Sequence, residues 1–85
     1  MLITQQIKAA RALLGWDQQD LARESNVGIA TIRRIEANDG PVKSTTTTTW
    51  RLQEALEKAG IIFIDGDDRA GPGVRLATPT RGRAG

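Results

Sequence analysis

Hydrophobic residues at the start of the chain recur at the spacing of a helix with one buried face. Ile7, Ala10 and Leu14 lie at positions i, i+3 and i+7, which share one side of an α-helix. Thr4 precedes them as a candidate N-cap, and Gly15 follows as a residue suited to the left-handed conformation that ends many helices. The pattern predicts a first helix between Thr4 and Gly15.

Two shorter helical segments follow, separated by a break at Asn26. Asp17 is placed to cap a helix from Gln18 to about Ser25, because its carboxylate can accept from free backbone N–H groups and favours the positive end of the helix dipole. Asn26 tolerates a positive φ better than any residue except glycine, as a tight turn requires. The chain restarts at Val27-Gly28, and its period indicates a third helix from Ile29 to Ala37.

The second half of the chain changes from helical to strand-like spacing. Asn38-Asp39-Gly40-Pro41 is a turn cluster, and the threonine run Thr45–Thr49 leads into a fourth helix that is most strongly helical from Trp50 to Ala59. Ile61-Ile62-Phe63-Ile64 is short, β-branched and bounded by turn residues, as is typical of a strand. Val74-Arg75-Leu76 is a candidate second strand. The expected inward faces of the second to fourth helices are formed by Leu21, Ala22, Ile32, Ile35, Leu52, Ala55 and Leu56.

Composition narrows the range of functions. The chain has 85 residues, which suits one small domain. It has no Cys and no His, so it lacks a disulfide framework, a thiol nucleophile, and the commonest general base and zinc ligand. No apolar run approaches the roughly 18 residues that span a bilayer, and the first residues do not form a signal peptide. We therefore expect a cytoplasmic, non-enzymatic protein without a cofactor or a metal.

Charge is distributed unevenly, although the net charge is only +2. Residues 61–68 carry Asp65, Asp67 and Asp68 and no basic residue, whereas residues 69–85 carry four arginines and no acidic residue. The preceding 60 residues are close to balanced. Any binding of DNA must therefore come from the local placement of basic side chains rather than from the overall charge.

The second and third predicted helices suit a particular geometry. Two short helices joined by a turn of three or four residues can cross at a large angle and present the second helix to a DNA groove. Ala22 is small where the two helices must approach each other, and Val27 and Ile32 supply apolar contacts that would fix the crossing angle. This combination is more specific than any of its residues alone.

With these residues the sequence resembles the phage-repressor helix-turn-helix family, of the Cro or XRE type. The resemblance covers about Gln6 to Gly60 and rests on Leu14-Gly15-Trp16, Gln18, Leu21-Ala22, Val27, Thr31-Ile32, Arg34-Ile35-Glu36, Leu52 and Glu54-Ala55-Leu56. It implies a bundle of four or five helices and dimeric operator binding by a bacterial or phage repressor. Similar folds also serve as antitoxins and restriction-modification controllers. This chain departs from the family at Asn26, where glycine is usual, and after Gly60, where many members have a fifth helix.

The resemblance implies that the start and outer side of the third helix lie in the major groove. Gly28, Ile29 and Ala30 would lie against base edges, the latter two through the apolar contact that suits a thymine methyl group. Arg34 would point into the groove, where bidentate contact between arginine and guanine is the commonest specific pairing. These four residues are the predicted base contacts.

The resemblance also implies contacts to the DNA backbone and one internal ion pair. Gln18 would reach a phosphate from the start of the second helix, assisted by the N–H groups of that helix. The loop before the fourth helix would clamp the backbone of the other strand. Arg11 would pair with Glu36. The predicted phosphate contacts are Gln18, Thr31, Arg33, Lys43, Ser44, Thr45 and Thr46.

Some of these features have simpler explanations. Arg33 and Arg34 are also compatible with an ordinary solvated helix face, and the threonine run with low-complexity sequence of poor helix propensity. Trp16 and Trp50 are interpreted as partly buried packing residues rather than platforms for base stacking. The acidic segment 65–68 lacks the spacing and terminal glutamate of an EF-hand, so a solvated turn is favoured over a calcium site.

The strand-like segment is a candidate dimerisation element. Alternate residues of a strand face opposite sides, so both sides of Ile61–Ile64 are apolar, while a small helical bundle covers only one. The second predicted strand, or a neighbouring subunit, would cover the other side. The loop is long for a hairpin, so strand pairing within one chain and across subunits both remain open. The candidate dimerisation residues are Ile61, Ile62, Phe63, Ile64, Val74 and Leu76.

We predict a mostly α-helical fold: a compact four-helix, repressor-like bundle with a C-terminal β element of one or two short strands. Residues 1–60 would form the DNA-binding domain, residues 61–77 a β-strand or hairpin extension, and residues 78–85 a flexible basic tail.

The predicted function is sequence-specific binding of double-stranded DNA by a transcriptional regulator, a homodimeric repressor of a palindromic operator. The alternative is an antitoxin or other protein-interaction module that uses the same fold to hold a partner protein. The first function requires Arg34 and the threonine-rich loop to share one exposed basic face. The second predicts an exposed apolar patch near residues 61–76.

Overall fold

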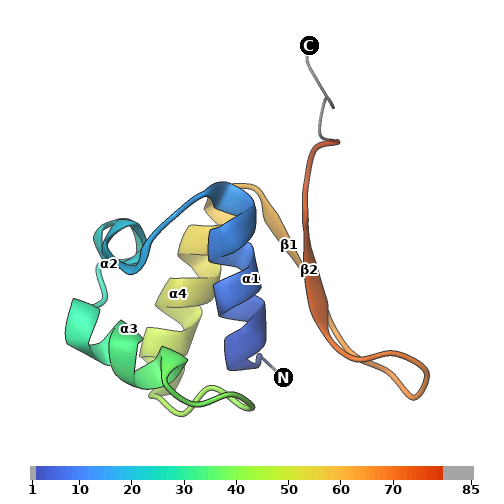
Figure 1. Cartoon of the computed structure of the whole chain (residues 1–85), viewed down its shortest axis with the longest axis horizontal. Helices are drawn as coiled ribbons and strands as arrows, with labels where there is room; N and C mark the ends of the chain where they lie inside the picture. The colour runs from blue at the N-terminus through green and yellow to red at the C-terminus, as the bar shows by residue number, and fades with distance from the viewer. Residues whose placement is uncertain (1, 80–85) are drawn as a thin grey trace.

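Four helices precede a β-hairpin in the computed structural model, which describes residues 2–79. The elements are α1 (Thr4–Leu14), α2 (Gln18–Ser25), α3 (Ile29–Glu36), α4 (Thr46–Lys58), β1 (Ile61–Ile64) and β2 (Gly73–Leu76). Figure 1 shows α2 and α3 at one end of the molecule and the hairpin at the opposite end, with α1 and α4 between them. The predicted fold class is confirmed; residues 80–85 of the predicted tail lie outside the described residues.

Most helix ends follow from residues that the sequence marks as caps. Gly15 after α1 and Asn26 after α2 have φ angles of 70° and 59°, so both adopt the expected left-handed conformation. At the start of α2, the Asp17 carboxylate accepts from Asp20 N at 2.8 Å, and the Asp20 carboxylate accepts from Asp17 N at 2.9 Å. This reciprocal pair satisfies two backbone donors that the helix itself leaves without partners.

The prediction that Thr4 caps α1 is wrong. Ile3 occupies the cap position, and Thr4 is the first residue of the helix. The Thr4 hydroxyl is buried and donates to the carbonyl of Ile35 at 3.2 Å, so it joins α1 to α3 instead. The side-chain oxygen of Gln6 accepts from Ile3 N at 3.0 Å, which satisfies a donor at the start of the helix.

The threonine run forms the first turn of α4. The Thr45 hydroxyl accepts from Thr48 N at 3.1 Å, so Thr45 is the N-cap of this helix. Three other boundaries differ by one residue from prediction: α3 ends at Glu36, α4 ends at Lys58 and β2 begins at Gly73. Such shifts are common at element ends, where the last turn or the last pair of residues is held by few hydrogen bonds.

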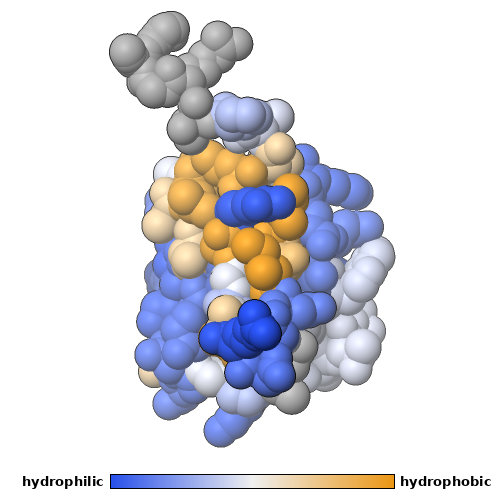
Figure 2. All heavy atoms as spheres, turned by 90° about the vertical axis from the view of Figure 1, so that its right-hand side faces the viewer, coloured by the Kyte–Doolittle hydropathy of each residue, from blue (hydrophilic) through white to orange (hydrophobic). Residues whose placement is uncertain are grey.

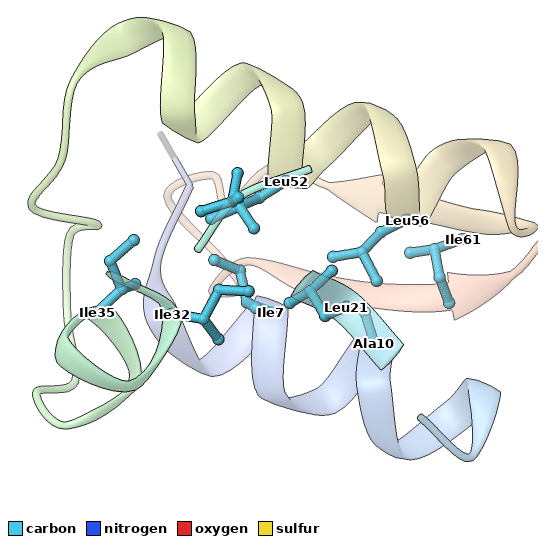
Figure 3. Packing of buried hydrophobic residues seen from close by; sticks show 9 residues of the cluster. Ile7, Ala10, Leu21, Ile32, Ile35, Leu52, Leu56 and Ile61 are labelled. Carbon is cyan, nitrogen blue, oxygen red and sulfur yellow. The ribbon is translucent and has the colours of Figure 1, made fainter. Parts of the chain in front are cut away.

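One apolar core joins all four helices to β1, as Figure 3 shows. Its buried members are Ile7, Ala10, Leu21, Val27, Ile32, Ile35, Leu52, Leu56 and Ile61. Trp16 packs half-buried against this cluster, as expected. Trp50 is 58% exposed, so its predicted partial burial is wrong. It precedes Leu52 by two residues, which places it about 200° around the helix from that core residue.

The two strands pair antiparallel within one chain. Ile61 lies opposite Leu76, and Phe63 lies opposite Val74. Residues that are directly opposite share a face of the sheet, and these four lie on the side packed against the helical core. The expectation that Val74 and Leu76 cover the second side of β1 is therefore wrong, because a paired strand extends a sheet sideways and does not lie on top of it.

The outer side of the hairpin stays apolar and exposed. Ile62 and Ile64 are 38% and 40% exposed, and Arg75 lies opposite Ile62. The hairpin is tied to the bundle near its loop by Gln6, whose Nε2 donates to the carbonyls of Ile64 at 3.2 Å and of Gly73 at 2.9 Å. None of the helices between residues 2 and 79 has the length and apolar character needed to cross a bilayer.

Candidate nucleic-acid interface

The turn between α2 and α3 is held by a side chain that sequence reasoning did not single out. Ser25 is buried; its hydroxyl donates to the carbonyl of Leu21 at 2.6 Å and accepts from Val27 N at 3.2 Å. Together with the left-handed Asn26, this hydroxyl turns the chain sharply into α3. Val27 and Ile32 are both buried, consistent with their expected role in fixing the crossing of the two helices.

The inner side of α3 carries a paired carboxylate. Arg11 donates from Nε to Glu36 Oε2 at 2.8 Å and from Nη2 to Glu36 Oε1 at 2.6 Å, the two-pronged geometry of a strong arginine–carboxylate pair. The side chains of Arg11 and Glu36 are 18% and 4% exposed. A third arginine donor, Nη1, reaches the carbonyl of Trp16 at 3.0 Å. The ion pair expected from the family resemblance is thus present, and it joins α1 to the end of α3.

Gln18 belongs to the same network. Its Nε2 donates to Glu36 Oε1 at 3.0 Å, so in this structure the side chain expected to reach a phosphate is bonded to the last residue of α3. The bond joins the first residue of α2 to the last residue of α3. Its contact with a phosphate stays a prediction.

Two opposing effects act on the pKa of Glu36. Burial raises it, whereas the hydrogen bonds from Arg11 and Gln18 lower it, with a smaller contribution from the positive charge of Arg11. The net result is a pKa below the ordinary value of a glutamate. Glu36 is therefore ionised at neutral pH, and its charge is part of the packing of α3 against α1.

The outer side and the start of α3 are open to solvent. Gly28, the N-cap, and Ala30, Arg33 and Arg34 are exposed, whereas Ile29 and Thr31 are half-buried. Gly28 has a φ of −60°, and a Cβ added to it would meet no atom within 4 Å. The fold therefore does not require glycine at this position.

Basic side chains gather beside this surface. Arg34 Nη1 donates to the carbonyl of Lys43 at 3.0 Å, so the loop before α4 lies next to α3. Lys43 is exposed, Ser44 is half-buried, and Thr45 and Thr46 are exposed at the start of α4. Among residues 2–79, neither Arg33, Arg34 nor Lys43 forms an ion pair with an acidic side chain. Arg34 thus lies next to Lys43, which precedes the exposed Thr45 and Thr46 by two and three residues.

The acidic loop of the hairpin forms a self-contained turn. The Asp67 carboxylate accepts from the backbone N–H groups of Arg69 and Ala70, both at 2.8 Å, and these bonds lower its pKa. Within residues 2–79 no cluster of three His, Cys, Asp or Glu side chains has the arrangement of a metal site.

Comparison with known protein families identifies a helix-turn-helix segment in this chain. A family model described as helix-turn-helix matches residues 7–58, which run from α1 to the last residue of α4. No curated protein matches the chain. The matched segment contains every residue predicted to contact DNA and both members of the Arg11–Glu36 pair, and it supports a DNA-binding transcription regulator. The hairpin lies outside it.

Proposed function

The chain belongs to the XRE-type helix-turn-helix family of DNA-binding transcription regulators, and we propose that it is a repressor that binds a palindromic operator as a homodimer. The observation that carries the proposal is the surface around α3. Its exposed start and outer side stand next to a basic loop, and its inner side is fixed to the bundle. The proposed function involves no catalysis and operates in the cytoplasm, where the operator is accessible.

Base reading is assigned to the first turn of α3 and to Arg34. The exposed Gly28 lets the backbone approach the base edges closely, and Ile29 and Ala30 offer methyl groups to thymine. Arg34 donates to a guanine in the major groove. Because Arg34 and Ala30 are four residues apart, they lie on the same side of α3 and read neighbouring base pairs.

Backbone contacts surround this reading surface. Lys43 and the exposed hydroxyls of Thr45 and Thr46 follow the end of α3 in the chain, and Gln18, at the start of α2, is bonded to Glu36, the last residue of α3. Thr31, Arg33 and Ser44 complete the proposed set. Contacts with phosphates position the protein on the duplex, and base contacts provide the discrimination.

We propose a dimer because one recognition helix contacts only a few base pairs. Two copies that place α3 about one DNA turn, roughly 34 Å, apart would read a palindrome with far greater selectivity. Of the six residues predicted to mediate dimerisation, only Ile62 and Ile64 are exposed. Figure 2 shows the apolar area on this side of the molecule. We therefore assign the subunit contact to the outer side of the hairpin.

The same apolar area favours a second candidate function. An exposed apolar surface marks a place where another protein can bind, and on this side of the hairpin Arg75 lies opposite Ile62, one of the two exposed isoleucines. An antitoxin-like protein that holds a partner protein would use this surface while retaining DNA binding at the opposite end.

Selection of bound sequences from random duplex DNA tests the proposal. We expect an enriched motif with two inverted half-sites and a complex that contains two protein chains. Recovery of unrelated sequences would contradict specific recognition. A single half-site bound by a protein that sediments as a monomer at micromolar concentration would contradict the dimer, and would favour the partner-binding function for the hairpin.

A further inference from the structure

The guanidinium of Arg34 is held by backbone before any DNA is bound. Its Nη1 donates to the carbonyl of Lys43 at 3.0 Å, nine residues along the chain. This is the only hydrogen bond that the Arg34 side chain makes within residues 2–79. The two residues also line a shallow hollow with Ile35, Asn38 and Pro41, between α3 and the loop. The Lys43 carbonyl is thus the protein acceptor that holds the Arg34 guanidinium within the described residues.

The loop that supplies this carbonyl is itself anchored to the start of α1. Thr4 N donates to the Gly40 carbonyl at 2.8 Å, and Val42 N donates to the Leu2 carbonyl at 3.1 Å. The side-chain oxygen of Gln5 accepts from Gly40 N at 2.9 Å. These bonds lie on both sides of Pro41, whose ring restricts the backbone. The anchored loop thus extends in an unbroken series of contacts from α1 to Arg34.

We propose that the Lys43 carbonyl is a positioning group for Arg34, so that the loop at the DNA backbone and base reading by α3 act as one coupled unit. The inference rests on the proposed function, in which Arg34 contacts a base. An arginine side chain has five N–H donors in one plane. Using one Nη1 donor for the carbonyl leaves the edge formed by Nε and Nη2 for the two acceptors of a guanine. A fixed guanidinium also loses less rotamer freedom on binding.

The experiment loosens the loop without altering any residue assigned to DNA contact. Gln5→Ala removes the acceptor of Gly40 N, and Gln5→Glu keeps an acceptor at the same place. Gln53→Ala is the matched control, because it removes an exposed glutamine hydrogen bond on α4, to Glu57. Each variant is compared in the wild-type and Arg34→Ala backgrounds, after thermal unfolding has shown that it is folded.

Two measurements are made on the full chain. The first is the ¹⁵N order parameter of Arg34 Nε in the free protein, which reports how firmly the side chain is held. The second is the ratio of two affinities. One is for the selected operator, and the other is for the same operator with a substitution at the base pair whose preference is lost in Arg34→Ala. We expect Gln5→Ala to lower the order parameter and to reduce the ratio about two- to threefold, the low end of the effect of one hydrogen bond, because the bond is exposed and two backbone bonds still anchor the loop.

The expected pattern is specific to positioning. Gln5→Glu should restore the ratio, Gln53→Ala should leave it unchanged, and Gln5→Ala should have no further effect once Arg34 is alanine. If Gln5→Ala leaves the affinity ratio unchanged while the wild-type protein clearly prefers its operator, this inference is wrong and the proposed function stands. The same holds if Gln5→Ala reduces affinity equally in the wild-type and Arg34→Ala backgrounds. Absence of any sequence preference in the wild-type protein would overturn the proposed function with it.

Discussion

The two sides of α3 differ in how their charged side chains are paired. On the inner side, the Glu36 carboxylate is buried and accepts from two nitrogens of Arg11 and from Gln18. On the outer side, Arg33 and Arg34 are exposed and form no ion pair among residues 2–79. One short helix therefore carries a satisfied anion on one side and unpaired cations on the other.

Solvent explains the difference. A buried charge without a partner costs several kcal/mol, so the inner carboxylate must be paired for the chain to fold. An exposed cation is hydrated and gains little from a surface partner, so Arg33 and Arg34 cost the free protein almost nothing. Such cations gain when they meet DNA, because each phosphate contact releases condensed counterions. The inner side serves stability and the outer side is available for recognition.

The largest expected effect comes from breaking the inner side. Glu36→Ala should lower the free energy of unfolding by about 3 kcal/mol, because it leaves Arg11 partly buried without its partner. Asp39→Ala is the control, since the Lys8–Asp39 pair is exposed and its loss should cost less than about 1 kcal/mol. Urea denaturation measures both variants. Equal and small losses would show that the Arg11–Glu36 pair behaves as a surface pair.

Low pH should weaken the Arg11–Glu36 pair by protonating the Glu36 carboxylate. Because the folded-state pKa of Glu36 lies below its ordinary value, its ionisation stabilises the fold fully above the unfolded pKa. That stabilisation should disappear as the pH falls from about 4.5, the ordinary value, through the lower folded-state pKa. The loss should be smaller than in Glu36→Ala, because the protonated side chain still fills its site.

Comparing Glu36→Gln with the wild type over this pH range isolates the contribution of the Glu36 charge to the free energy of unfolding. The difference in unfolding free energy between the two proteins should shrink towards low pH, since both then carry a neutral side chain at position 36. A difference that is constant with pH would mean that Glu36 does not titrate with a lowered pKa.

On the outer side, Arg34→Ala should affect recognition rather than folding. We expect specific binding to weaken by about 1–3 kcal/mol and base preference to relax at one position of each half-site. Fluorescence anisotropy with the selected operator and with single-base variants measures both. Equal losses on operator and random DNA would contradict the assignment of Arg34 to a base edge.

Lys43→Ala should produce a smaller and more uniform change. As a proposed phosphate contact, Lys43 should contribute equally to all DNA sequences, and its removal should make the salt dependence of binding shallower by about one unit. A salt titration on operator and random DNA measures this slope. A loss confined to the operator would indicate that Lys43 reads a base.

The smallest effect on stability is expected at the start of α3. Gly28→Ser should raise the unfolding free energy by only a few tenths of a kcal/mol, because serine is a slightly better N-cap than glycine and its Cβ has room. Operator affinity should nevertheless fall, since the new side chain would stand where backbone approaches the bases. Unchanged affinity would place the start of α3 away from the DNA.

Much of the site could be predicted from local sequence because its signals are local. The cap at Asp17, the left-handed Asn26 and the period of α3 depend on neighbouring residues, and the structure confirms all three predictions. The family resemblance supplied the Arg11–Glu36 pair, which spans 25 residues and has no local signature. The helical period also places Trp50 on the outer side of α4, away from Leu52, as the structure shows.

The remaining contacts depend on partners that only folding brings together. The Thr4 hydroxyl meets the Ile35 carbonyl 31 residues away, Gln6 meets strand carbonyls 58 and 67 residues away, and Arg34 meets the Lys43 carbonyl across the loop. Each of these bonds ends on a backbone carbonyl, a group that every residue has and that carries no sequence signal. The sequence by itself determined the helices, the turn and the chemistry of α3. The tertiary structure alone decided which hydroxyl, amide and guanidinium hold those elements in register.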